Sequence, residues 1–170
     1  MPRLAPHLLA LALIAATSGC KDQGPDRAPA QVTISSPPGT TITSGTTVTL
    51  TASVTNAAGT VLSGNTAEWT STDATIASVT STGVVTAIHA GSAQITATVG
   101  TVHSLPITLT VTPGAAAQLA LRTQPAGGVS ALPLTTQPVI EIRDAAGNLV
   151  SSSTDVVTAI IATGGGTITG

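Results

Sequence analysis

Residues 47–55 are TVTLTASVT, and in this stretch apolar and hydroxyl-bearing or small side chains alternate without a fault. Strict alternation is typical of a β-strand with one dry and one wet face, because successive side chains of a strand point to opposite sides. Residues 92–99 repeat the pattern with the apolar side chains Ala93, Ile95, Ala97 and Val99. Residues 105–112 repeat it with Leu105, Ile107, Leu109 and Val111. We therefore expect three strands whose apolar side chains face inward.

Shorter stretches of the same character lie between these strands. We expect further strands at residues 32–35, 67–71, 76–79 and 84–88. Turn signals rich in Gly, Asn, Ser or Pro separate them. About seven short strands at regular spacing predict an all-β fold, a β-sandwich over residues 31–112.

The composition supports a packed β fold and excludes nucleic-acid binding. The 170 residues include 5 Lys+Arg, 7 Asp+Glu, a single Trp and neither Phe nor Tyr, and 42% of them are apolar. Binding to nucleic acid needs clustered basic side chains for the phosphates or aromatic rings for the bases, and the chain has neither. Disorder is not expected, because it goes with low hydrophobicity and high net charge.

Three neighbouring stretches carry a family resemblance. They are EWTSTDATIASV at 68–79, GVVTA at 83–87 and AGSAQITA at 90–97. Through them, residues 31–112 resemble the bacterial Ig-like domain of group 2. The resemblance implies an immunoglobulin-like β-sandwich without catalytic residues. It also implies a setting among bacterial surface proteins, since such domains occur in intimin-like adhesins and many other surface proteins.

Trp69 is the lone aromatic residue, and it has two interpretations. It is either an exposed residue for sugar stacking or protein contact, or a core residue that anchors the sandwich. It matches the core tryptophan of the resembled family, and the alternation of its strand turns it inward, so we favour the core. The other core residues that we expect include Leu50, Val79, Ile95 and Leu109.

The first twenty residues are typical of an export signal. Arg3 precedes a continuous apolar run at 8–16 (LLALALIAA), and Ser18, Gly19 and Cys20 follow. A positive start, a short apolar run and small residues characterise a secretory signal peptide, and the run is far shorter than the roughly 20 residues that span a bilayer. The segment resembles a bacterial lipoprotein signal, which implies cleavage between Gly19 and Cys20 and lipidation of Cys20.

The lipoprotein resemblance implies a signal peptide at 1–19, followed by a lipidated Cys20 and a flexible tether that together span residues 20–30. Two or more acyl chains anchor a protein stably where a single chain does not, so the expected partner is a membrane. Lys21 after the cysteine implies the outer membrane by the family's sorting habit. The alternative is an ordinary cleaved signal that leaves a free thiol. Because Cys20 is the single cysteine, no disulfide stabilises the fold.

Residues 113–170 contain a second group of strand patterns, at 118–122, 137–144, 156–163 and 167–169. The stretch IEIRDAAGN at 140–148 resembles the first half of another, invasin-type bacterial Ig-like domain. Because such a sandwich takes about 100 residues, we expect an incomplete second domain with an exposed apolar patch, formed by Val139, Ile140, Ile142, Val157, Ile160 and Ile161. Three explanations of the incomplete domain remain open: the sequence is a fragment of a longer protein, another chain completes the domain, or the domain is partly disordered. We favour the fragment.

We expect no enzyme activity, no cofactor and no metal site. His89 and His103 lack the short spacing of a zinc pair, and we expect them in solvated loops. Nucleophile, dinucleotide and phosphate-loop motifs are missing. Asp144 and Asn148 offer oxygens for calcium, but their loop lacks a full set of carboxylates. We therefore favour capping of the turn at 144–148.

The sequence predicts a non-enzymatic, lipid-anchored protein of the cell envelope whose Ig-like domains act as a stalk or adhesion module. Alternative hypotheses are an adhesin for a surface polysaccharide or protein, and the anchor segment of a longer surface enzyme. Interaction hot spots usually use Trp, Tyr and Arg. The chain has one Trp, and its Arg27, Arg122 and Arg143 are dispersed. Tight binding by this segment alone is therefore not expected.

Overall fold

The computed structural model describes residues 27–35, 39–128, 132–160 and 162–163. All the regular secondary structure in these ranges is β-strand, which confirms the predicted all-β class. The strands are β1 Gln31–Ser35, β2 Thr41–Thr43, β3 Thr47–Thr49, β4 Thr51–Thr55, β5 Glu68–Ser71, β6 Ala77–Val79, β7 Val84–Ala87, β8 Gly91–Val99, β9 Val102–His103, β10 Ile107–Thr112, β11 Gln118–Thr123 and β12 Val139–Arg143.

The strands from β1 to β10 form two layers packed face to face. In the first layer β1 pairs with β4, and β3 pairs with β7, which also pairs with β6. β3 and β4 are consecutive parts of one stretch interrupted at Leu50, whose N–H donates to the carbonyl of Gly83 over 2.8 Å. The second layer has the order β2-β10-β8-β5, with β9 beside β8. This is the division of strands found in a constant-type immunoglobulin sandwich.

The amino-terminal strands contribute to both layers. β1 runs antiparallel to β4 in the first layer, whereas β2 runs parallel to β10 in the second, with Ile42 opposite Val111. The sequence did not predict β2 or β9, because strands of three and two residues are too short for alternation to be recognised. The first two strands of the chain thus belong to different layers and link the layers at one edge.

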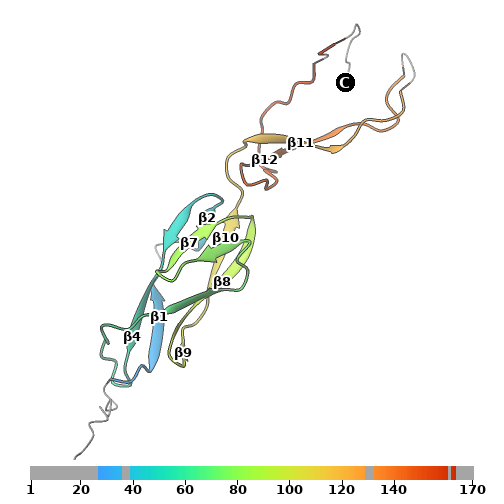
Figure 1. Cartoon of the computed structure of the whole chain (residues 1–170). Helices are drawn as coiled ribbons and strands as arrows, with labels where there is room; N and C mark the ends of the chain where they lie inside the picture. The colour runs from blue at the N-terminus through green and yellow to red at the C-terminus, as the bar shows by residue number, and fades with distance from the viewer. Residues whose placement is uncertain (1–26, 36–38, 129–131, 161, 164–170) are drawn as a thin grey trace, which may run out of the picture.

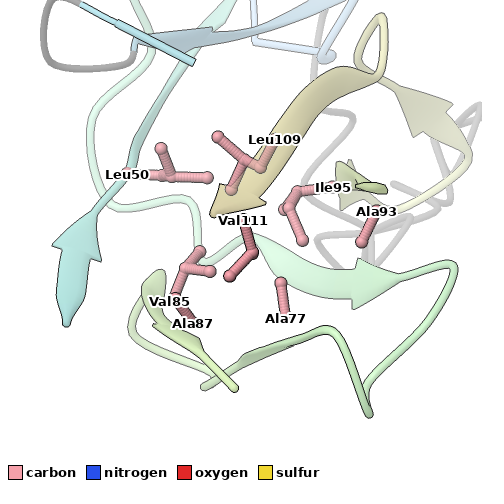
Figure 2. Close-up of a cluster of buried hydrophobic side chains, with 8 residues drawn as sticks. All are labelled: Leu50, Ala77, Val85, Ala87, Ala93, Ile95, Leu109 and Val111. Atoms are coloured by element: carbon pink, nitrogen blue, oxygen red, sulfur yellow. The ribbon is translucent and has the colours of Figure 1, made fainter. Parts of the chain in front are cut away.

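The core lies between the layers and consists of small aliphatic side chains. Figure 2 shows the larger of two buried clusters, which contains Leu50, Ala77, Val85, Ala87, Ala93, Ile95, Leu109 and Val111. A smaller cluster contains Val32, Val54, Ala97 and Val99. The inward face predicted for residues 92–99 is confirmed, because all four of its apolar side chains are buried.

The inward position predicted for Leu105 is wrong. Its side chain is 86% exposed, and β10 begins only at Ile107. Ser104 takes the inward position instead: its N–H donates to the carbonyl of Ala97 (2.8 Å), and its hydroxyl accepts from the Ala97 N–H (3.0 Å). Pro106 follows, and proline has no N–H to donate to a strand partner. The pairing of β10 with its neighbours therefore starts at Ile107, after the proline.

β11 and β12 form a separate antiparallel ribbon. The strand predicted at 156–163 is wrong within the described residues, where no strand is assigned after β12. A two-stranded ribbon offers no second sheet against which this apolar segment would pack. Val139, Ile140, Val157 and Ile160 are exposed, as predicted for the apolar patch, and Ile142 is partly buried. Ile161 and the strand predicted at 167–169 lie outside the described residues.

The sandwich and the ribbon follow one another along a line (Figure 1). β1 begins at the pole of the sandwich that is farthest from the ribbon, and β10 leads from the sandwich toward β11 (Figure 1). The chain therefore enters the sandwich at one pole and leaves it at the other.

The described residues contain no apolar helix of membrane-spanning length.

The sandwich depends on a close approach at Gly83, in the turn between β6 and β7. Gly83 has a φ of +80°, and a Cβ placed there would lie 2.5 Å from the carbonyl oxygen of Leu50 and 3.0 Å from Cζ2 of Trp69. We expect Gly83→Ala to lower the free energy of unfolding by about 1–3 kcal/mol, because strained backbone and a close contact are combined. Urea unfolding followed by the fluorescence of the single tryptophan measures the loss.

Gly59→Ala is the matched control. Gly59 has nearly the same φ, +79°, but a Cβ placed on it would meet no atom within 4 Å. The control therefore carries the backbone cost without the contact, and it should lose clearly less stability than Gly83→Ala. Equal losses in the two variants would contradict a tight contact between Gly83 and the core.

Candidate functional site

The candidate functional site is the joint between the sandwich and the β11–β12 ribbon. β10 ends at Thr112 and β11 begins at Gln118, so residues 113–117 form the covalent connection. The turn at 144–148, which follows β12, makes a second contact with the sandwich. We call these two segments, together with the sandwich residues that they contact, the joint. Attachment at two places restricts the ribbon more than a single linker does, because fewer backbone conformations satisfy both.

Asp144 organises the turn and the connection. Its Oδ1 accepts hydrogen bonds from the N–H groups of Ala146 (3.0 Å) and Asn148 (2.8 Å). Its Oδ2 accepts from the N–H of Gly114 and from Nδ2 of Asn148, both at 2.8 Å. These bonds, first among them that of the Asn148 side chain, stabilise the carboxylate and lower the pKa of Asp144 to about 2, although burial opposes the shift.

Asn148 extends from the turn to the sandwich. Its Oδ1 accepts from the N–H of Ala90 (2.9 Å), and its Nδ2 donates to Oδ2 of Asp144 and to Oγ of Ser44 (3.1 Å). The Ser44 hydroxyl in turn donates to the carbonyl of Ile88 over 2.7 Å. A reversed amide would place its N–H₂ against the Ala90 N–H, so the network fixes the orientation of the side chain.

The joint is held by polar contacts rather than by a large apolar interface. A typical hydrogen bond contributes about 0.5–1.5 kcal/mol, and one to a charged group about 1.5–3 kcal/mol. Asp144 and Asn148 are both buried, at 2% and 9% exposure. Separating the ribbon from the sandwich would break the bonds of Asn148 to Ala90 and Ser44 together. The turn is therefore fixed against the loops of the sandwich.

The contacts of Asp144 and Asn148 decide between the two interpretations of this loop. Both carboxylate oxygens of Asp144 face N–H donors, and Oδ1 of Asn148 faces another. A calcium ion would need the same lone pairs, and the donors would repel it. The predicted turn capping is confirmed. In the part of the chain that the structure describes, no group of three or more His, Cys, Asp or Glu side chains could hold a metal.

Trp69 lies between the core and the surface. Its indole is partly buried, packs against both hydrophobic clusters and lies where a Cβ on Gly83 would come within 3.0 Å of it. It also lines an open groove of about 400 Å³ on the side of the sandwich. Leu50, Ile95 and Leu109 are fully buried, whereas Val79 is only partly buried against them. Trp69 is thus in contact with the core without being enclosed by it.

The two histidines bond outside the joint network, although His89 lies in the chain between Ile88 and Ala90, which belong to it. Nδ1 of His89 lies 2.9 Å from the carbonyl oxygen of Thr75, and Nδ1 of His103 lies 2.9 Å from Oγ1 of Thr98. Both residues are exposed, but His103 belongs to β9 rather than to the predicted loop. Thr75 also donates its hydroxyl to Asp73, which lowers the pKa of that carboxyl. Gly19 and Cys20 lie outside the described residues.

The sequence did not reveal what Asn148 contacts. Its partner Ser44 is 104 positions away along the chain, and Ser44 lies in a turn without a distinctive pattern. The motif DAAGN predicted the turn, because Asp and Asn bond to nearby backbone and Gly147 adopts a positive φ. A contact between two separate loops has no local signature, so only the three-dimensional arrangement shows it.

Comparison with protein families agrees with this architecture. Residues 29–111 match the family model described as bacterial Ig-like domain (group 2). That segment is similar to bacterial Ig-like domains of group 2. Its bounds contain both layers of the sandwich except the end of β10, and they stop before the connection at residues 113–117. Among curated proteins, no match to the chain was found.

Several solved structures match part of the chain. They include the S-layer protein SbsC, domains 5-6 (21% identity, TM-score 0.44), S-layer protein rSbsC(31-844) (21%, 0.44) and SbsC, domains 4-9 (22%, 0.42). The matches cover 72%, 75% and 73% of this chain. The chain spans 65%, 18% and 22% of the length of those structures. Similarity at this level indicates nothing about function.

Asn148→Ala is expected to loosen the joint without unfolding the Ig-like domain. The variant removes the acceptor for the Ala90 N–H and the donor to Ser44, but it leaves the core of the sandwich intact. Hydrogen–deuterium exchange at neutral pH should show faster exchange at the Ala90 amide, by about tenfold for each 1.4 kcal/mol lost. Asn65→Ala, at an exposed asparagine far from the joint, should leave this amide protected. Unchanged protection in Asn148→Ala would contradict the bridging role.

The joint should also open in acid. The pKa of Asp144 is lowered from 3.8 to about 2, so the carboxylate contributes its stability above pH 3.8 and loses it as the pH falls toward 2. The Ala90 amide resonance, followed by NMR from pH 6 to pH 2, should therefore shift mainly below pH 4. Asp144→Asn should abolish this transition, whereas Asp73→Asn, at another carboxyl with a lowered pKa, should retain it. A transition that survives in Asp144→Asn would assign it to another group.

Proposed function

We propose that the protein is a non-enzymatic, lipid-anchored stalk of the bacterial cell envelope, in which β-domains are joined end to end. The observation that carries the proposal is the joint. A module that serves as a spacer must transmit its orientation to the next one, and the Asn148 bridge between the turn and the sandwich provides such a coupling.

The direction of the chain supports a stalk. The chain enters the Ig-like domain at one pole and leaves it at the opposite pole, where the joint begins (Figure 1). Modules with ends at opposite poles extend as a rod when they are repeated, whereas modules with adjacent ends fold back on themselves. In this proposal the β11–β12 ribbon contains the first strands of a partial second Ig-like domain at residues 113–170.

The surface of the Ig-like domain suits an exposed position. Most of its outward strand positions carry hydroxyl groups rather than charges, as on β10, where Thr108 and Thr110 are exposed and Leu109 and Val111 are buried. Hydroxyl groups bond to water without the long-range fields of charged side chains. The domain therefore stays hydrated although only 7% of the residues are charged.

The anchor is proposed from the sequence. A signal peptide at 1–19 is removed, Cys20 receives acyl chains, and the tether up to residue 30 connects the lipid to β1. Lys21 favours the outer membrane. In this arrangement the pole at which β1 begins faces the membrane, and the joint faces away from it.

Cys20→Ser tests the anchor. The variant should leave the membrane fraction of the producing bacterium, because its thiol can no longer accept lipid, and it should appear as a soluble or unprocessed product. Ser18→Ala is a control that keeps the cysteine and a small residue before it. A Cys20→Ser protein that still fractionates with membranes would refute lipid anchoring.

Small-angle scattering tests the stalk. A compact globule of roughly 150 residues has a radius of gyration of about 15 Å. The processed chain in detergent-free form, obtained as Cys20→Ser without residues 1–19, should exceed this value and show the long maximum dimension of a rod. A compact particle would refute the end-to-end arrangement.

A further inference from the structure

The groove beside Trp69 is part of neither the joint nor the closed core. Its lining residues come from three places in the Ig-like domain: the β3–β4 stretch, the segment that leads into β5, and the β6–β7 turn. They are Leu50, Thr51, Ala52, Val54, Asn65, Thr66, Ala67, Trp69, Ser81 and Thr82. Its volume of about 400 Å³ lies within the range of small-molecule sites.

The groove exists because the first layer is incomplete at this point. β7 accompanies the β3–β4 stretch only as far as Leu50, where the Leu50 N–H bonds to the carbonyl of Gly83. Beyond it, β4 pairs with β1 on one side, and among the described residues only Val61 and Leu62 approach its other side, at Val54 and Thr55. The edge of β4 at Thr51 and Ala52 is therefore open, and the indole lies beneath the gap.

The lining has a distinct chemistry. Leu50 and Val54 are almost fully buried, so the apolar surface comes from the partly exposed indole of Trp69 and from Ala52 and Ala67. The rim carries the hydroxyls of Thr66 and Ser81 and the amide of Asn65. In the described part of the chain, those two hydroxyls have no hydrogen-bond partner within the protein. None of the lining side chains is ionisable. A charged ligand would lose water here without gaining a counter-charge, which is costly.

We propose that this groove binds an uncharged saccharide, with one or two sugar units in contact with the protein. A neutral sugar presents hydroxyls that can both donate and accept, which matches the Thr, Ser and Asn groups of the rim. Its ring also carries apolar C–H faces, which match the exposed part of the indole. The site deepens the proposed function, since it rests on a position at the cell surface and gives the stalk a ligand there.

Weak binding is expected from this geometry. The groove is open, and it has one aromatic side chain that is already partly used by the core. Several copies along a stalk would raise the overall affinity through effective concentration without any new contact. The proposal therefore requires that a single groove binds the saccharide weakly but measurably.

The single tryptophan makes the test specific to the site. The full-length processed chain, with Cys20→Ser and without residues 1–19, is titrated with cellotetraose, maltotetraose and chitotetraose, and emission and acrylamide quenching of Trp69 are recorded. At least one of these neutral probes should change the emission in a saturable way and reduce quenching. A tetragalacturonate, which is charged at neutral pH, should bind at least tenfold more weakly.

Two variants locate the binding. Ser81→Arg places a long charged side chain at the rim and should weaken the binding of the neutral probe at least tenfold. Thr108→Arg is the matched control, because it makes a similar change at an exposed position on β10, in the other layer. Unfolding in urea shows that both variants are folded. Equal effects of the two variants would overturn the assignment to the groove.

Absence of any saturable change with all three neutral probes would also overturn the proposal. A protected indole on addition of an extended apolar peptide, but not of the saccharides, would assign the open edge of β4 to strand addition instead. Neither result affects the stalk, because scattering of the unliganded chain and membrane fractionation test that function independently.

Discussion

The sandwich depends on the close approach of the Trp69 indole to the position that a Cβ on Gly83 would occupy. The indole belongs to the second layer, Gly83 to the first, and Trp69 packs against both hydrophobic clusters. The rest of the core consists of Ala, Val, Leu and Ile, and the chain has no disulfide within it. One large side chain therefore connects two groups of small ones, and only a glycine leaves the necessary room.

The same shortage of large side chains shapes the surface. Four alanines, Ala77, Ala87, Ala93 and Ala97, are almost completely buried, so the layers are in close contact over much of their area. Where β7 begins beside Leu50, small side chains cannot fill the remaining gap, and the indole fills it only in part. The groove beside Trp69 is thus a consequence of how this core is built.

Much of the sandwich could be predicted because its information is local. The alternation in β8 places every apolar residue correctly, since burial on one face requires a period of two. Leu105 shows the limit of this rule: Ser104 bonds to Ala97 and Pro106 interrupts the ladder, so the apolar face starts later. The segment at 156–160 shows another, because an apolar pattern forms a strand only where a partner strand is available. The joint was beyond prediction, since it connects loops that are distant in sequence.

The chemistry of the joint explains how a small polar contact can orient a module. The hydrogen bonds from the backbone of Ala146 and Asn148 to Asp144 form within the turn itself, so the turn is preorganised before it meets the sandwich. Little conformational entropy then remains to be lost when Asn148 docks between Ser44 and Ala90. An apolar joint would tolerate sliding, because hydrophobic contacts are not directional. Directional bonds from a rigid turn allow one arrangement, and this selectivity is what a spacer built from repeated domains requires.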